Sequence, residues 1–293
     1  MRFAFIAAAD SKYPVAWMCR HLEVSNAGYY AWKEADESDR AKRRRRLEPV
    51  VKAYHKASHG TYGSRRIHTD LKTAGEDIGR NTVAAIMRDA GIQGVPKRRF
   101  RKTTDSDHDD PLCENILDRQ FDPDQQDTCW AADITYLRTK DNGWLYLAVV
   151  IDLFSRRVVG WAIADTMHTA LVLSALKQAF KVRQPGDGLL HHSDRGSQYT
   201  SRAHRQLLED HSAICSMSRK AECWDNAVVE SFFGTFKQEL IYGRKLRSSD
   251  ELITAVEDYI DRFYNVRRRH SKLGNISPLE YELHAAREIA AAA

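Results

Sequence analysis

Three acidic residues stand at positions where a carboxylate is costly unless something uses it. Asp133 lies inside residues 130–137, an aromatic and β-branched stretch that is typical of a strand. Asp194 follows the apolar pair at 189–190, at the expected end of another strand, and Glu230 lies on an expected helix. Carboxylates that meet repel one another unless divalent cations lie between them. Two such cations ~3.5–4 Å apart can activate a water or hydroxyl and stabilise the leaving oxygen of a phosphodiester.

The expected helix around Glu230 determines the surroundings of its carboxylate. At ~100° per residue, Asn226, Glu230 and Lys237 share a polar strip at the edge of an apolar face. Glu230 is therefore partly desolvated and needs a cation or a hydrogen-bond partner. The apolar face consists of Val229, Phe232, Phe233, Phe236 and Leu240.

The segment that carries these acids has the pattern of an α/β domain. Three strand-like stretches come first, and then helices alternate with two further strands. This order predicts one five-stranded mixed sheet covered by helices. The expected strands are 129–138, 144–153, 158–164, the stretch that ends at Asp194, and 213–217; the expected helices are 168–182, 201–211 and the helix of Glu230.

The N-terminal third is basic, whereas the rest of the chain is acidic. Residues 1–103 carry 22 Lys and Arg against 11 Asp and Glu, and the remainder carries 23 against 29, within an overall net charge of +5. The basic part suits a polyanion and the acidic part suits metal ligation. The five cysteines are scattered without a CxxC pair, so we expect neither a disulfide framework nor a Cys-rich zinc site.

We expect the basic N-terminal part to be all-α. Residues 15–22 and 26–33, with Ser25 as N-cap, have the outline of a helix-turn-helix or of an ordinary helical hairpin, and the pattern leaves both open. A helix at 36–58 contains four consecutive arginines. The expected regions are a helical region with a basic helix at 1–58, a second helix-turn-helix segment at 59–95, a basic-to-acidic linker at 96–111, the α/β core at 112–245 and a C-terminal helical subdomain at 246–293.

Basic and polar side chains at the helix starts of residues 59–95 are candidates for DNA contacts. The alternative is that they are only caps and surface charges. The linker begins with a basic run that could follow a DNA backbone. The candidates are Arg65, Arg66, Arg80 and Asn81 in the helices, and Lys97, Arg98 and Arg99 in the linker.

Four linked motifs carry a resemblance to a known family. WAADITYL, HSDRGSQYTS, SMSRKAECWDNAVVESFFGTFKQE and YNVRRRHSKLGNISPLEY resemble the second-frame (OrfB) products of bacterial insertion-sequence transposases. Those are DDE enzymes with a retroviral-integrase-like, RNase H-like core. Thirty-five residues separate Asp194 from Glu230, as in the D,D(35)E pattern of that family. The resemblance covers roughly residues 13–281.

The resemblance implies a transposase that cleaves 3′ ends and joins them to target DNA, using two Mg²⁺ ions (or Mn²⁺). It implies Asp133, Asp194 and Glu230 as catalytic metal ligands and Lys237 as a DNA contact near the cleaved phosphate. Asn226 is expected either to contact the DNA or to order the loop before the helix of Glu230. His192 either supports Asp194 from behind or is simply packed. Asp152 is a further acid at a strand end; we expect it to pair with Arg156 or Arg157 rather than to be a fourth ligand.

The resemblance also implies partners, and two other functions have to be weighed. Expected partners are transposon inverted repeats, target DNA, further copies of the chain on DNA, and a first-frame (OrfA) product or fusion. The alternatives are an RNase H-fold nuclease acting on RNA–DNA hybrids and a non-catalytic DNA-binding protein with structural acids. Because no run of ~18 apolar residues and no convincing signal peptide occur, we expect a cytoplasmic protein without a membrane role.

Overall fold

The computed structural model describes residues 1–35, 38–96, 112–141, 143–220 and 222–292. The chain divides into two compact units, Met1–Ala53 and Tyr54–Ala293. The boundary falls within one helix, α4 (Asp39–Ala57). Within the described residues, no helix is both long and apolar enough to cross a membrane.

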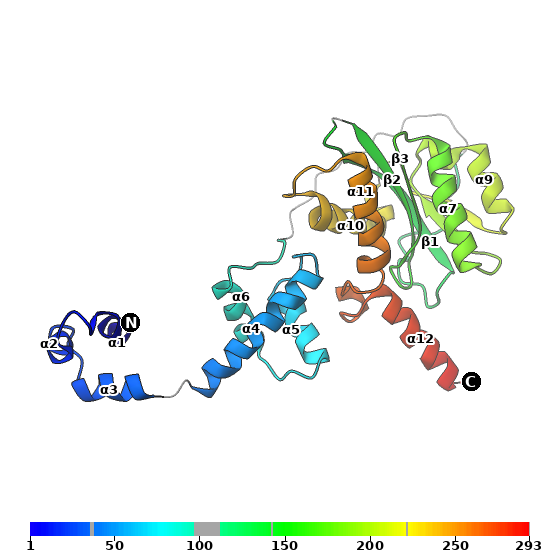
Figure 1. Ribbon diagram of the computed structural model, residues 1–293. Helices are drawn as coiled ribbons and strands as arrows, with labels where there is room; N and C mark the ends of the chain where they lie inside the picture. Colours follow the sequence, from blue (N-terminus) through cyan, green and yellow to red (C-terminus); the bar gives the residue numbers. More distant parts are fainter. Residues whose placement is uncertain (36–37, 97–111, 142, 221, 293) are drawn as a thin grey trace. The chain divides into compact units, whose positions relative to one another are not determined.

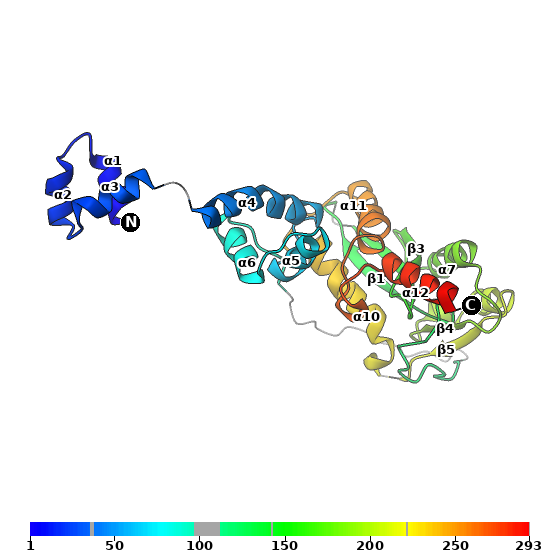
Figure 2. The same cartoon turned by 90° about the horizontal axis from the view of Figure 1, so that it is seen from below.

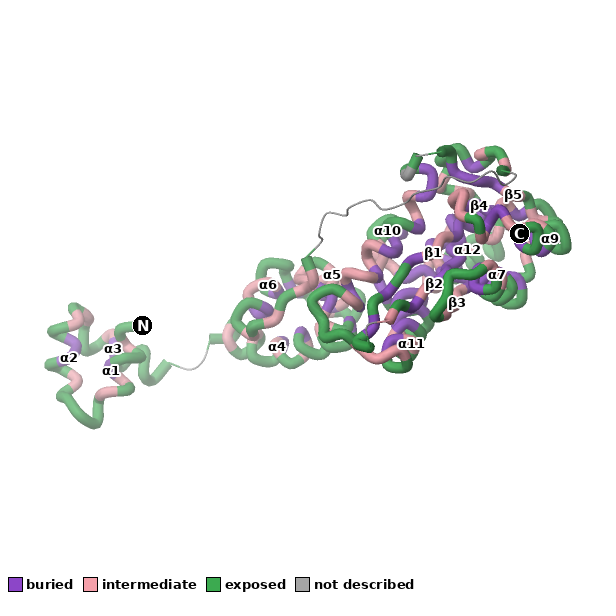
Figure 3. Tube along the Cα trace, turned by 90° about the horizontal axis from the view of Figure 1, so that it is seen from above, coloured by how far each residue is buried: buried purple, intermediate pink, exposed green. Residues whose placement is uncertain are grey.

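The first unit is a small helical bundle. It contains α1 (Arg2–Ala9), α2 (Val15–His21) and α3 (Asn26–Glu34), as expected for the helical reading of this region. The Ser25 hydroxyl accepts a hydrogen bond from the backbone N–H of Gly28, which caps α3 as predicted. The core is small, and most of the surface of these helices is exposed (green in Figure 3). Its buried members are Ile6, Met18, Cys19 and Tyr29.

A second helical pair begins the larger unit. It consists of α5 (Ser64–Thr73) and α6 (Arg80–Asp89), within the segment expected to form a helix-turn-helix. Five apolar side chains of these helices are buried. They are Ile67, Leu71, Val83, Ile86 and Met87.

The larger unit is built on one sheet, and among the described residues it has five strands in the order β3-β2-β1-β4-β5. β1 and β2, and β2 and β3, pair antiparallel, whereas β1 pairs parallel with β4 and β4 with β5. The predicted mixed sheet is therefore confirmed. The strands are β1 (Cys129–Arg138), β2 (Trp144–Asp152), β3 (Val158–Ala164), β4 (Leu190–Ser193) and β5 (Ile214–Met217), and β4 and β5 lie at one edge in Figure 2.

One face of the sheet packs against α7 (Thr169–Arg183) and α9 (Arg202–Glu209), which lie together in Figure 1. Alternate residues of β1, Trp130 and Ala132, enter this core, and Tyr199 on the short α8 (Ser197–Thr200) joins them. Since side chains alternate across a strand, Asp133 points to the other face. That face is covered by the helix that carries Glu230, α10 (Ala227–Phe236).

The elements around and after α10 are all helical. A one-turn helix, η1 (Cys223–Asn226), precedes α10, and a π-helical turn, η2 (Lys237–Ile241), extends it. All the residues predicted to form the apolar face of this helix are buried. The other elements are α11 (Ser249–Glu257), η3 (Asp258–Tyr264), η4 (Ser271–Leu273) and α12 (Pro278–Ala292).

Candidate active site

The parallel pairing of β1 and β4 brings two of the three acids together. The register aligns Ala131 with His192, so Asp133, in the interior of β1, and Asp194, one residue past the end of β4, lie side by side. Asp133 is half-buried, and its Oδ1 accepts a hydrogen bond of 2.7 Å from the N–H of Ile134. Asp194 Oδ1 accepts one of 3.0 Å from the N–H of Gly196. The two carboxylates therefore leave the sheet at the same edge.

The third acid reaches this edge because the start of α10 is tied to β1. The Asn226 side chain is buried, and its amide donates a 3.0 Å hydrogen bond to the carbonyl of Ala132, next to Asp133. Glu230 follows one helical turn later and is exposed. One side-chain bond thus sets how the helix of Glu230 meets the strand of Asp133.

Asp133 interacts electrostatically with the other two acids. Loss of hydration raises the pKa of the Asp133 carboxyl well above its ordinary value, and the negative charges of Asp194 and Glu230 add to this shift. The Ile134 N–H and the Lys237 ammonium oppose the shift. Repulsion is therefore only partly compensated by the protein.

Two further side chains complete the surroundings of Asp133. Lys237 lies 4.6 Å from the centre of the Tyr136 ring, and burial lowers its pKa while Asp133 acts in the opposite direction. The Tyr199 side chain is buried, and burial, followed by the charges of Asp133 and Asp194, raises its pKa. The Tyr199 hydroxyl has no hydrogen-bond partner among the described residues.

The donor set has the chemistry that a hard divalent cation prefers. Asp133, Asp194 and Glu230 supply carboxylate oxygens, which are the usual ligands of Mg²⁺ and Mn²⁺. In the described part of the chain, no group of three or more His, Cys, Asp or Glu residues is drawn together closely enough to hold an ion. After loss of hydration, the negative charges of Asp194 and Glu230 contribute to the raised pKa of Asp133, and a cation between the carboxylates would offset that repulsion.

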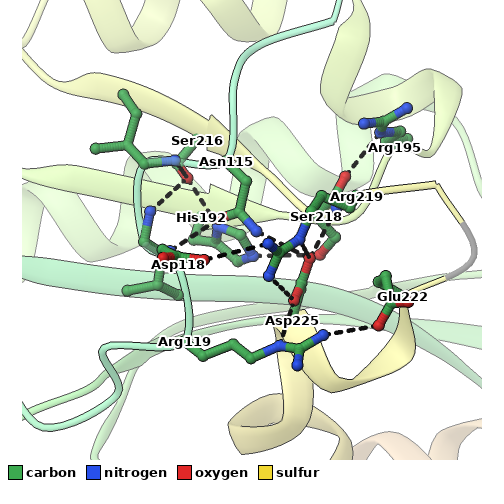
Figure 4. Close-up of polar contacts among 12 residues, drawn as sticks. Asn115, Asp118, Arg119, His192, Arg195, Ser216, Ser218, Arg219, Glu222 and Asp225 are labelled. Carbon is green, nitrogen blue, oxygen red and sulfur yellow. Dashed lines mark hydrogen bonds and ion pairs between the residues drawn. The ribbon is translucent and has the colours of Figure 1, made fainter.

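A buried carboxylate that the sequence reasoning missed holds the loop in front of α10. Asp225 is fully buried, and Figure 4 shows it between two guanidinium groups. Arg219 donates from Nε and Nη2 at 3.0 Å each, and Arg119 donates from Nε at 2.7 Å. Asn115 and the N–H of Arg219 donate two more bonds at 2.8 and 2.9 Å. The Arg219 hydrogen bonds hold the pKa of Asp225 well below its usual range.

His192 is a packed histidine with a structural role. Its ring is buried, with Nδ1 2.9 Å from the Ser216 hydroxyl and Nε2 3.2 Å from the Ser218 hydroxyl, so neither nitrogen remains for Asp194 (Figure 4). Burial lowers the pKa of His192 to about 4, which keeps the ring neutral. His192 therefore joins β4 to β5 behind Asp194, and the structure favours the packed reading over direct support.

The expected partner of Asp152 is wrong. Asp152 is fully buried at the end of β2, and its ion-pair partner is Arg183 of α7 at 3.4 Å, rather than Arg156 or Arg157. The N–H groups of Phe154 and Asp127 also donate to it. Burial raises the pKa of Asp152 to about 7. Arg156 pairs with Asp122 and Arg157 with Glu282, contacts between segments that no local pattern could reveal.

The candidate DNA-contacting residues divide into exposed and internal ones. Arg65, Arg80 and Asn81 are exposed at the starts of α5 and α6. Arg66 instead lies over the Tyr62 ring and reaches Glu239 at 3.5 Å. The Asn226 side chain is buried and binds the backbone of β1, which favours the loop-ordering role over DNA contact. Lys97, Arg98 and Arg99 lie outside the described residues.

Family models match three stretches of the chain. An HTH-like domain model matches residues 42–100. Two integrase core domain models match residues 123–223 and residues 212–278. Together these matches cover the α4–α6 segment, the sheet, α10 and most of the C-terminal part.

Full-length relatives agree with these models. The chain is 40% identical over 264 residues to an uncharacterized 31 kDa protein of insertion element IS600 from Shigella sonnei, covering 90% of this chain and 97% of that protein. It is 38% identical over 284 residues to transposase InsF for insertion sequence IS3A from Escherichia coli K12, covering 96% and 98%. Among solved structures, it is similar to the HTLV-2 integrase catalytic core domain in complex with magnesium, with 17% identity, coverage of 53% and 96%, and a TM-score of 0.41.

The family assignment rests on the sequence relatives and on the integrase core models. The strand order and the helices on both faces of the sheet are the RNase H-like arrangement expected for such a core. The chain belongs to the family of insertion-sequence transposases that carry an integrase core domain.

Proposed function

We propose that the chain catalyses DNA transposition through the carboxylates of Asp133, Asp194 and Glu230. The supporting observation is the shared edge at which Asp133 and Asp194 emerge, with Glu230 docked against it by Asn226. These carboxylates would hold two divalent cations, Mg²⁺ or Mn²⁺. When bound, such ions activate a water or a 3′-hydroxyl and stabilise the leaving oxygen of the cleaved phosphodiester.

The residues around the carboxylates contribute orientation and charge. Asn226 fixes the approach of α10, and the Asp225 cluster holds the preceding loop, so Glu230 reaches the site from a supported helix. Lys237 places a positive charge beside Asp133, suited to a DNA phosphate near the cleaved bond. Arg65, Arg80 and Asn81 present exposed donors from the HTH-like segment for binding the transposon end.

The reaction has two stages that use the same carboxylates. The first hydrolyses a phosphodiester at the transposon end and leaves a 3′-hydroxyl. In the second, that hydroxyl attacks a phosphodiester of target DNA, and the new strand joint replaces the broken one. Joining two transposon ends to one target requires more than one copy of the chain on DNA. A first-frame product, separate or fused, would add further DNA binding.

Family membership favours transposition over the two alternatives, since a hybrid-specific nuclease has no need of the HTH-like segment. A non-catalytic protein would gain nothing from carboxylates that raise the pKa of Asp133.

Asp133→Asn tests the proposal in a strand-cleavage assay with a labelled transposon end and Mg²⁺. We expect cleavage to fall by about 10³-fold or more, because several kcal/mol of charge stabilisation are lost, while DNA binding in a gel-shift assay is retained. Asp152→Asn is the matched control, because Asp152 is a buried strand-end acid that pairs with Arg183. Cleavage that persists in Asp133→Asn would refute catalysis through this carboxylate.

A further inference from the structure

A cavity of about 200 Å³ borders α10 on a different face from Glu230. The residues of α10 that line this cavity lie roughly 60° (Ala227) or more around the helix from Glu230, and Glu230 itself is not among them, so the cavity borders a neighbouring face of the helix. This volume is room for a small ligand.

The cavity wall is unusually rich in hydrogen-bond donors. Its basic side chains are Arg156, Arg268, His270 and Lys272, and its hydroxyls belong to Ser231, Thr235 and Tyr264. Among the described residues that line it, none is Asp or Glu. Such a wall is suited to an anion rather than to a cation or an apolar ligand.

Arg156 supplies the observation that points to a ligand. Its side chain is buried, with 7% exposure. One guanidinium nitrogen, Nη2, donates to Asp122 at 2.6 Å, whereas Nη1 is buried with no partner among the described residues. A guanidinium stays charged and offers five N–H donors in a fork that matches a tetrahedral oxyanion. An unsatisfied guanidinium nitrogen at the wall of a cavity is therefore placed to donate a hydrogen bond to an anion.

The charges around the cavity leave a positive excess. Asp122 bridges Arg156 and Lys272, at 2.6 and 2.8 Å, from an exposed position at the rim. Arg268 is buried and donates to Glu239 from Nε and Nη2, at 2.8 Å each. With Arg66, which reaches Glu239 at 3.5 Å, four basic side chains share these two carboxylates. Of these two carboxylates, only Asp122 is well hydrated, since 61% of its side chain is exposed, so its ion pairs are the more easily broken.

We propose that this cavity binds a phosphate group. Ser231 and Thr235, one helical turn apart on α10, would donate to its oxygens from one side, and Arg156 and Lys272 from the other. The phosphate belongs either to a DNA backbone or to a free phosphate compound. The site is independent of the carboxylate chemistry, because none of its residues is a candidate metal ligand.

Calorimetric titration with inorganic phosphate tests the site directly. The full chain is titrated in metal-free chloride buffer at constant ionic strength. We expect saturable binding that weakens at least tenfold in the Ser231→Ala/Thr235→Val double variant, because charge-assisted hydrogen bonds are lost. Thr254→Val, which changes an exposed threonine of α11, is the matched control and should bind as the parent does.

A variant that is expected to bind phosphate more tightly excludes misfolding as the explanation of the weaker binding. Asp122→Asn removes the negative charge that competes for Arg156 and Lys272, so we expect phosphate to bind several-fold more tightly. Loss of structure could not produce tighter binding. Wild-type protein that binds no phosphate, or variants that all bind it equally, would overturn the proposal.

DNA binding at several salt concentrations identifies the source of the phosphate. If a backbone phosphate occupies the cavity, the double variant binds duplex DNA more weakly, and its salt dependence decreases by about one counterion. If phosphate binding weakens but DNA binding does not, the occupant is a free phosphate compound. Failure of the carboxylate proposal would appear in the Asp133→Asn cleavage assay, and this titration would not change.

Discussion

Asp133 and Asp225 are both withdrawn from water, yet their surroundings carry opposite charge. Asp225 is fully buried and receives hydrogen bonds from two guanidinium groups, an amide and a backbone N–H (Figure 4). Asp133 faces two other acids, and Lys237 compensates only part of their charge. The pKa of Asp225 is lowered by the Arg219 hydrogen bonds, and that of Asp133 is raised by lost hydration and by acidic neighbours.

The difference separates a structural carboxylate from a functional one. A buried acid that stabilises the fold has its charge matched within the chain, as Asp225 does. An acid whose neighbours repel it makes the folded state less stable, and that is useful only if a cation or substrate supplies the missing charge. The two acids belong to one site, since the Asp225 loop leads directly into the helix of Glu230.

Removing the compensated acid should have the largest effect on stability. Asp225→Asn leaves Arg119 and Arg219 facing each other without a carboxylate. We expect the free energy of unfolding to decrease by about 2–3 kcal/mol. This is below the ~3–5 kcal/mol of a fully buried pair, because the two guanidinium groups are 42% and 45% exposed. Urea denaturation measures the change. An unchanged unfolding midpoint would contradict the structural role given to Asp225.

Removing Asp133, whose charge is only partly compensated, should change the free energy of unfolding by less and in the opposite direction. In metal-free buffer, Asp133→Asn relieves repulsion from Asp194 and Glu230. We expect stability to rise by about 0.5–1 kcal/mol, the usual size of a charge interaction at a partly exposed position. Thermal unfolding in EDTA measures it. A destabilised variant would show that Asp133 serves the fold rather than chemistry.

Asp152 sharpens the comparison as an intermediate case. It is fully buried, but its single guanidinium partner lies 3.4 Å away, and burial raises its pKa to about 7. Its stabilising contribution is present below the unfolded pKa near 3.8 and is lost as the pH rises through about 7. Asp225, whose pKa is lowered, stabilises the fold above its unfolded pKa near 3.8. This stabilising contribution is lost as the pH falls below that value.

Carbon-13 NMR of labelled aspartates measures both values. We expect the Asp152 carboxyl to titrate near pH 7, whereas Asp225 stays ionised below pH 3.8. Similar titration of the two carboxyls would contradict the roles given to their arginines.

Much of the fold was predictable because it depends on local periodicity. The bounds of β1 and β3 match the expected strands, and the apolar face of α10 is buried as its spacing requires. The positions of the three acids also follow from local pattern, since Asp133 lies inside an apolar strand, Asp194 follows a strand and Glu230 borders the apolar face of its helix. Their meeting depends on the β1–β4 register, which the sequence indicated only through the family resemblance.

The compensating charges were not predictable, because their partners are distant in sequence. Arg119 and Asp225 are 106 residues apart, and Arg183 lies in α7, whereas the neighbours first expected to pair with Asp152 lie in the turn between β2 and β3. A chain with 45 basic and 40 acidic residues offers too many possible pairs. The sequence left two roles open for Asn226 for a related reason, since it could not show that the polar side chain is turned inward to a backbone carbonyl.

Calorimetric titration with Mn²⁺ tests the central claim most directly. If Asp133, Asp194 and Glu230 hold divalent cations, the parent chain and Asp152→Asn should release or absorb heat saturably on binding Mn²⁺. Asp133→Asn and Asp194→Asn should then show binding weakened by at least tenfold, because each loses a charged ligand. Equal Mn²⁺ affinity in all four proteins would contradict a metal site at the shared edge of β1 and β4.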